Sequence, residues 1–140
     1  MKVMAIDYGD ARTGIAISDA LGMICGFSAV IHDRREAVVA NEITALCKTH
    51  QVGQLVLGLP KNMNDSEGPR AEKSRSFGLL LQTQTGLPLA LWDERRTTVD
   101  AHRILSDVNK RGKKRKDTVD AVAASLILEG YLRRQELGLK

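Results

Sequence analysis

The 140-residue sequence has few aromatic residues, with Phe, Trp and Tyr together making up 4% of it. Proteins that hold single-stranded nucleic acids on a stacking platform need several aromatic rings, so the sequence disfavours that class. Cysteines are also scarce: Cys25 and Cys47 form no CxxC pair and lie in apolar stretches. We therefore expect two buried, reduced thiols, as in cytoplasmic proteins, rather than a disulfide or a zinc site.

Long apolar runs are absent as well. No stretch approaches the roughly 18 apolar residues that a membrane-spanning helix needs. The apolar run at the amino terminus is interrupted by Asp7 and is too short for a signal peptide. The expectation is a cytoplasmic protein without a membrane partner, folded as one domain over residues 1–140.

The excess of positive charge is concentrated in one segment. The formal net charge is +4, and a single acid, Asp107, lies among seven basic residues: Arg103, Lys110, Arg111, Lys113, Lys114, Arg115 and Lys116. Clustered Lys and Arg displace counterions from phosphates, which predicts a basic loop that binds nucleic acid. Charge alone supports a solvated loop without a partner equally well.

Short apolar runs predict five strands. The runs Lys2–Ile6, Gly14–Ser18 and Ile24–Ile31 are separated by turn residues, which predicts an antiparallel meander. The continuous run Leu55–Leu59 is typical of a parallel strand buried on both faces, and Leu87–Trp92 is the fifth predicted strand.

Helical periodicity fills the segments between and after the last strands. One apolar stripe ends at His50, which is expected in the core, and further helices are predicted over 69–84 and 97–108. The last helix should begin at Asp117 as N-cap and carry a stripe to Gly130. The order predicts an α/β fold with a five-stranded mixed sheet, in which a three-strand antiparallel meander joins two parallel strands and helices cover both faces.

Three acidic residues stand beside apolar elements that must be buried. Asp7 ends the first strand, Glu94 follows the fifth, and Asp120 lies in the predicted first turn of the last helix. Carboxylates that share a cleft repel one another unless cations separate them, and oxygen ligands suit Mg²⁺ or Mn²⁺. Two such ions about 4 Å apart bind the attacking and leaving oxygens of a phosphodiester displacement.

Each acid also has a simpler interpretation. Asp7 precedes Gly9 and is a common residue in turns. Glu94 is able to pair with Arg95 or Arg96, and a carboxylate such as Asp120 is stabilised near a helix N-terminus. The coincidence of all three with the ends of elements is what favours a site.

Four blocks of sequence, in this order, resemble the motifs of one family. They are DYGDARTGIA at 7–16, GLPKNM at 58–63 with EGPR at 67–70, DERRTT at 93–98 and DAVAASLIL at 120–128. The set, which covers almost the whole chain, is similar to the YqgF family of bacterial RuvC-like nucleases, within the ribonuclease H-like superfamily.

The resemblance implies a ribonuclease H-like fold and metal-dependent phosphodiester hydrolysis. It assigns the catalytic and metal-binding roles to Asp7, Glu94 and Asp120, with two bound Mg²⁺ or Mn²⁺ ions. The family is linked to maturation of the 5′ end of pre-16S ribosomal RNA and was earlier labelled a Holliday-junction resolvase. RNA is therefore favoured over branched DNA, and a non-catalytic nucleic-acid-binding module in ribosome assembly is the alternative from another class.

Several basic residues are expected to bind the nucleic acid. Arg12 and Arg70 match basic positions of the family motifs and are suited to bidentate phosphate contacts, unless they pair with the acids of the site. The further candidates are Lys61, Arg95, Lys110, Arg111, Lys113, Lys114, Arg115 and Lys116.

Two residues depart from the family pattern. Asp65 stands where the family usually has glycine, which adds a negative charge to the central loop. Asp117 lies three residues before Asp120, on nearly the same helix face, and is a possible fourth ligand, although the N-cap role is favoured.

The spacing Asp7-x-Gly9-(x)4-Gly14 also resembles the first phosphate loop of the actin, Hsp70 and sugar-kinase superfamily, which binds ATP. That site needs two such domains, and 140 residues provide one without a second copy of the loop. No dimer signal is legible in the sequence, so a monomer or a weak dimer is expected.

Overall fold

The computed structural model describes residues 1–60, 68–93 and 112–136, with the side chains of 112–119 and 136 left out. Within these ranges the elements are β1 (Lys2–Tyr8), β2 (Arg12–Ser18), β3 (Cys25–His32), α1 (Glu36–His50), β4 (Val52–Leu59), α2 (Pro69–Thr85), β5 (Leu89–Asp93) and α4 (Gly112–Glu136). The helix predicted over 97–108 lies outside the described residues. None of the described helices is long and apolar enough to span a bilayer.

The strands form a five-stranded sheet in the order β3-β2-β1-β4-β5. β1, β2 and β3 pair antiparallel, whereas β1, β4 and β5 pair parallel. This arrangement confirms the predicted mixed sheet with its three-strand meander. Because parallel strands end at the same edge of a sheet, the carboxyl ends of β1, β4 and β5 lie together, and this is where α/β folds collect functional groups.

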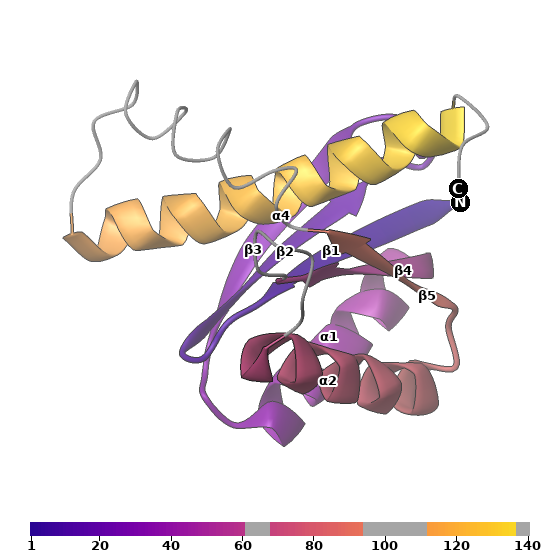
Figure 1. The fold of residues 1–140 in the computed structure, drawn as a ribbon. Helices are drawn as coiled ribbons and strands as arrows, with labels where there is room; N and C mark the ends of the chain where they lie inside the picture. The colour runs from indigo at the N-terminus through magenta and orange to yellow at the C-terminus, as the bar shows by residue number, and fades with distance from the viewer. Residues whose placement is uncertain (61–67, 94–111, 137–140) are drawn as a thin grey trace.

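Helices cover both faces of the sheet, as the sequence predicted. α1 and α2 lie on one face and α4 crosses the other (Figure 1). Along β1 the side chains alternate between the two layers: Met4 and Ile6 belong to the core under α1 and α2, and Val3 and Ala5 to the core under α4. The same alternation directs the next odd residue, Asp7, toward α4.

The last helix begins earlier than predicted. α4 starts at Gly112, so Asp117 is an interior residue and not its N-cap, and Asp120 lies well beyond the first turn. The intervening residues, Lys113 to Lys116, are Lys and Arg, which have high helix propensity, and they extend the helix toward the amino terminus. The carboxyl half of the predicted basic loop is therefore helical.

Two expectations about buried polar residues were only partly correct. Cys47 is buried on α1, and burial raises the pKa of its thiol to about 11, but Cys25 is only half-buried. His50 is also half-buried rather than in the core, because it is the last residue of α1 and its ring lies 4.4 Å from that of Phe27. Both half-buried residues lie where an element begins or ends, and periodicity does not resolve burial there.

α4 approaches the sheet closely at Gly14 of β2. A Cβ atom placed on Gly14 would overlap the carbonyl oxygen of Asp120 and lie 2.8 Å from its carbonyl carbon. Gly130 makes the reciprocal contact near the other end of α4, where an added Cβ would lie 2.6 Å from the Trp92 ring. The two glycines therefore determine how close the helix lies to β2 and to β5.

We predict that Gly14→Ala destabilises the protein by about 2 kcal/mol, because the added methyl group forces helix backbone away from the sheet. Gly26→Ala, on β3, is the matched control, since its Cβ would find no atom of the described residues nearer than 3.4 Å. Urea unfolding followed by circular dichroism measures both variants. Equal unfolding free energies for the two variants would contradict the close contact.

Candidate active site

A polar pocket of about 310 Å³ lies at the carboxyl end of β1. β1, the β1–β2 loop, β2, α2 and α4 all contribute to its wall, through Asp7, Tyr8, Gly9, Asp10, Ala11, Arg12, Arg70 and Asp120. Segments that are far apart in the sequence thus meet at the edge of the sheet where the carboxylates were expected.

Gly14 is a neighbour of both Asp7 and Asp120. In the pairing of β1 with β2, Asp7 lies opposite Gly14, and Gly14 in turn contacts the backbone of Asp120. The missing side chain allows α4 to pass directly beside the strand pair. Both acids line the same pocket as a result.

The Asp7 carboxylate is half-buried. Among the residues that the structure describes, none forms a hydrogen bond or ion pair with its side chain. A partly buried carboxylate without a partner carries a desolvation cost. Its oxygens are available to a ligand that enters the pocket.

Arg12 forms an ion pair with Asp120 rather than pointing freely into the pocket. Its Nε donates a hydrogen bond of 2.7 Å to Oδ2 of Asp120, and the two side chains are 31% and 17% exposed. The sequence had left a phosphate contact and an ion pair with a site acid as alternatives for Arg12. The structure shows the ion pair, which fixes the direction of the Asp120 carboxylate.

Asp10 binds two cations from the first turns of α2. Arg70 Nη1 donates to its Oδ2 at 3.0 Å, and Lys73 Nζ donates to its Oδ1 at 3.1 Å. The hydrogen bond from Lys73, with the nearby charges of Arg70 and Lys73, lowers the pKa of Asp10 below its ordinary value of 3.8. Arg70 thus lies at the pocket as predicted, held by an acid of the site.

Asp10 and Lys73 were not predicted from the sequence as members of this cluster. Lys73 follows Arg70 by three residues, a spacing that places both on one helix face, so that part of the signal was present. Nothing in the sequence indicated that the β1–β2 loop would bring Asp10 to that face.

The remaining predicted site residues are not placed by the structure. Glu94, Arg95, Lys61, Lys110 and Arg111 lie outside the described residues, and so does Asp65. Five further candidates lie in α4, but their side chains are not described: Lys113, Lys114, Arg115, Lys116 and Asp117. Glu94 is the residue directly after β5, whose carboxyl end lies at the same edge of the sheet as that of β1.

The acids of the pocket have the oxygen chemistry that Mg²⁺ and Mn²⁺ prefer. Asp7 and Asp120 contribute two carboxylates to its lining. The described residues contain no group of three His, Cys, Asp or Glu side chains able to hold a metal ion. A third carboxylate would have to come from a residue such as Glu94.

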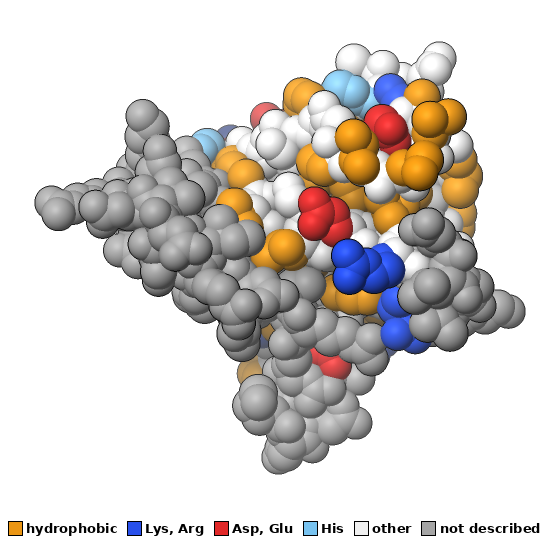
Figure 2. Space-filling model, turned by 90° about the horizontal axis from the view of Figure 1, so that it is seen from above, with side chains coloured by type: hydrophobic (Ala, Val, Ile, Leu, Met, Phe, Trp, Pro, Cys, Tyr) orange, Lys and Arg blue, Asp and Glu red, His pale blue; other side chains and the backbone are white. Residues whose placement is uncertain are grey.

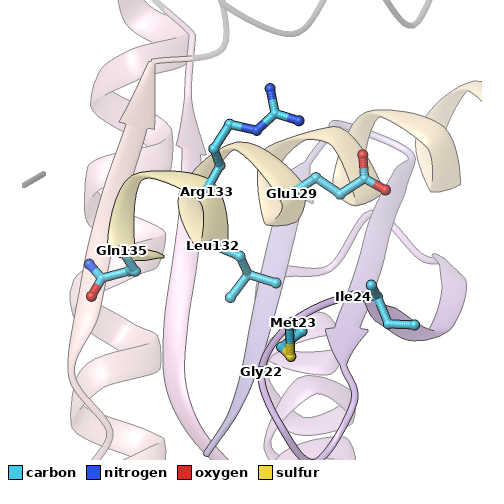
Figure 3. A pocket seen from close by; sticks show the side chains of 7 residues that line it. All are labelled: Gly22, Met23, Ile24, Glu129, Leu132, Arg133 and Gln135. Atoms are coloured by element: carbon cyan, nitrogen blue, oxygen red, sulfur yellow. The ribbon is translucent and has the colours of Figure 1, made fainter. Parts of the chain in front are cut away.

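A larger hollow, of about 500 Å³, lies near the turn that joins β2 to β3 and the carboxyl end of α4. Figure 3 shows its lining, in which Leu132 points toward Met23 and Ile24, and Glu129 and Arg133 extend to the outside. Exposed apolar side chains also gather in the upper right of Figure 2. Glu129 is the only carboxylate among the described residues that line this hollow, so the carboxylate pocket is the candidate active site.

Sequence comparison identifies one family. The model of the RuvX family, described as Holliday junction resolvase, matches residues 1–134. A protein of Halothermothrix orenii is 45% identical over 135 residues, which is 96% of each chain, and bears the name "Putative pre-16S rRNA nuclease". A Clostridium novyi protein of the same name is 40% identical over 132 residues, covering 94% of this chain and 98% of its own.

Two solved structures with the same fold are complexes of resolvases with Holliday junctions. RuvC of Thermus thermophilus, in complex with a Holliday junction substrate, aligns with a TM-score of 0.66 over 100% of this chain and 98% of its own, at 11% identity. The fowlpox virus resolvase, also with a Holliday junction, aligns with a TM-score of 0.60 over 96% and 99%, at 11% identity. At such low identity these likenesses show the fold alone.

The fold agrees with that of the resolvases, and the sequence match extends over nearly the whole chain. Both findings confirm the resemblance inferred from the four sequence blocks. The chain belongs to the RuvX family of nucleases, hydrolases that act on ester bonds, and has the ribonuclease H-like fold of RuvC.

Proposed function

We propose that this chain is a divalent-metal-dependent nuclease that acts in the cytoplasm on the 5′ end of pre-16S ribosomal RNA. The observation that carries the proposal is that Asp7 and Asp120, from opposite ends of the sequence, line one polar pocket. The family and the names of its curated members support phosphodiester hydrolysis as the reaction.

Asp7, Glu94 and Asp120 would hold two Mg²⁺ or Mn²⁺ ions. Bound ions of this kind lower the pKa of water and neutralise charge that develops on the reacting phosphate. Asp7 would bind through the oxygens that have no partner among the described residues, and Asp120 would bind through the carboxylate that it presents to the same pocket. Arg12, fixed by Asp120, faces the same pocket and would attract the scissile phosphate.

RNA is the proposed substrate because the curated relatives at 40–45% identity are named for pre-16S rRNA. The basic residues over 103–116 and those near the pocket would bind the backbone by charge and shape rather than by reading bases. Asp117, which is not an N-cap, would be a fourth metal ligand or would take no part in metal binding. The protein would act as a monomer or a weak dimer.

Cleavage of branched DNA is a second candidate, favoured by the description of the matching family as a Holliday junction resolvase. A junction has two-fold symmetry, so its symmetric cleavage normally requires a dimeric enzyme. The two candidates therefore differ in substrate and in the expected oligomeric state.

We predict that Asp7→Asn lowers metal-dependent cleavage about 1,000-fold or more, since metal binding supplies several kcal/mol of transition-state stabilisation. The amide is similar in shape to the carboxylate, so the fold and RNA binding in EDTA should persist. Glu42→Gln, at an exposed position of α1, is the matched control and should cleave normally. Full Mg²⁺-dependent activity of Asp7→Asn would refute the site.

We also predict that a pre-16S leader RNA is cleaved at least about tenfold faster than a four-way DNA junction under equal Mn²⁺ or Mg²⁺. EDTA should abolish both reactions. Faster cleavage of the junction would favour the resolvase. Salt-dependent binding of both nucleic acids without metal-stimulated hydrolysis of either would instead favour a non-catalytic assembly module.

A further inference from the structure

Two cations on α2 pair with one acid of the β1–β2 loop. Arg70 and Lys73 each donate a hydrogen bond to a different oxygen of the Asp10 carboxylate, at 3.0 and 3.1 Å. Asp10 and Arg70 line the pocket together with Asp7, and Lys73 joins them through its hydrogen bond to Asp10. The cluster therefore sits directly next to the proposed metal ligands.

The packing of α2 determines where its two cations point. Ala71, Ser74 and Phe77 are buried against the sheet, which leaves Arg70 and Lys73 on the side that faces the loop. Lys73 Nζ also lies 5.7 Å from the centre of the Tyr8 ring, and that ring stacks on Phe77 at 3.9 Å. The aromatic face attracts the ammonium group, so Lys73 would keep its position if Asp10 moved away.

The Asp10 carboxylate is displaceable. Its side chain and that of Arg70 are each 61% exposed, and that of Lys73 is 48% exposed. Ion pairs in contact with solvent contribute little to stability because water screens them. A competing anion would therefore break these ion pairs at a small cost in free energy.

The local charge balance shows what Asp10 does to the pocket. Among the described residues of the site, Asp7, Asp10 and Asp120 are balanced by Arg12, Arg70 and Lys73. Without Asp10, the same residues would carry an excess positive charge. A carboxylate and a phosphodiester each offer anionic oxygens to guanidinium and ammonium groups, so they are direct competitors.

We propose that Arg70 and Lys73 form a phosphate subsite for the nucleic-acid strand, and that the Asp10 carboxylate occupies this subsite until a phosphate of the substrate displaces it. The inference rests on the proposed function, since it concerns the substrate of the same pocket. Because a phosphate must first displace Asp10, the protein should bind a polyanion more weakly than it would if Arg70 and Lys73 had no acidic partner. The affinity should also depend less on salt.

The test measures binding of a short mixed-sequence single-stranded RNA in EDTA over a series of KCl concentrations. Asp10→Asn should bind about threefold or more tightly at low salt, and the slope of log K against log salt should steepen by about 0.7 for each cation released to a phosphate. The asparagine keeps the size of the side chain but removes the competing charge.

Glu129→Gln is the matched control, because it removes one exposed negative charge from the far end of α4. It should leave affinity and slope near those of the unaltered protein. If Asp10→Asn behaves like Glu129→Gln, the subsite is refuted.

Arg70→Gln supplies a second criterion. It should weaken RNA binding more in the Asp10→Asn background than in the unaltered protein, because only there is Arg70 free before the RNA arrives. Equal losses in the two backgrounds would overturn the displacement.

Cleavage by the unaltered protein with Mn²⁺ tests the proposed function separately. Tighter binding by Asp10→Asn without any cleavage would support the subsite and contradict the nuclease. Cleavage together with unchanged binding by Asp10→Asn would leave the nuclease intact and overturn the subsite.

Discussion

The contact between Gly14 and the backbone of α4 is the constraint on which the site depends. Asp7 belongs to a central strand and Asp120 to a helix that lies on top of the sheet. Only because Gly14 lacks a side chain does the helix pass close enough for both acids to line the same pocket. The close approach of α4 at Gly14 is thus required both for the packing of the core under α4 and for the lining of the pocket.

Charge compensation is the second principle of the pocket. Acids at the end of a strand and on a nearby helix would repel one another. Cations from neighbouring elements reduce this repulsion. Arg12 pairs with Asp120, and Arg70 and Lys73 pair with Asp10, whereas Asp7 has no such partner in the described part of the chain. Among the described acids of the pocket, Asp7 is therefore the one without a compensating cation.

The sequence predicted the sheet because burial imposes a strong pattern on strands, as the continuous run Leu55–Leu59 illustrates. It also indicated Asp7 and Asp120 as site candidates, since each stands beside such a pattern; the structure brings both to one pocket, and their role in metal binding stays a prediction. The start of α4 was wrong because a run of Lys and Arg gives no periodic signal and Asp117 resembled a cap. The link from Asp10 to Arg70 depends on the tertiary approach of a loop to a helix, which no local pattern encodes.

The central claim is that one metal site unites Asp7, Glu94 and Asp120. Its most direct test replaces Mg²⁺ with Fe²⁺ and maps, by mass spectrometry, where hydroxyl radicals generated at the bound iron cut the chain, since divalent ions share such oxygen ligands. The account predicts three groups of cuts, close to residues 7, 94 and 120, that excess Mg²⁺ suppresses together. Cuts that omit one of these segments, or that Mg²⁺ does not suppress, would contradict it.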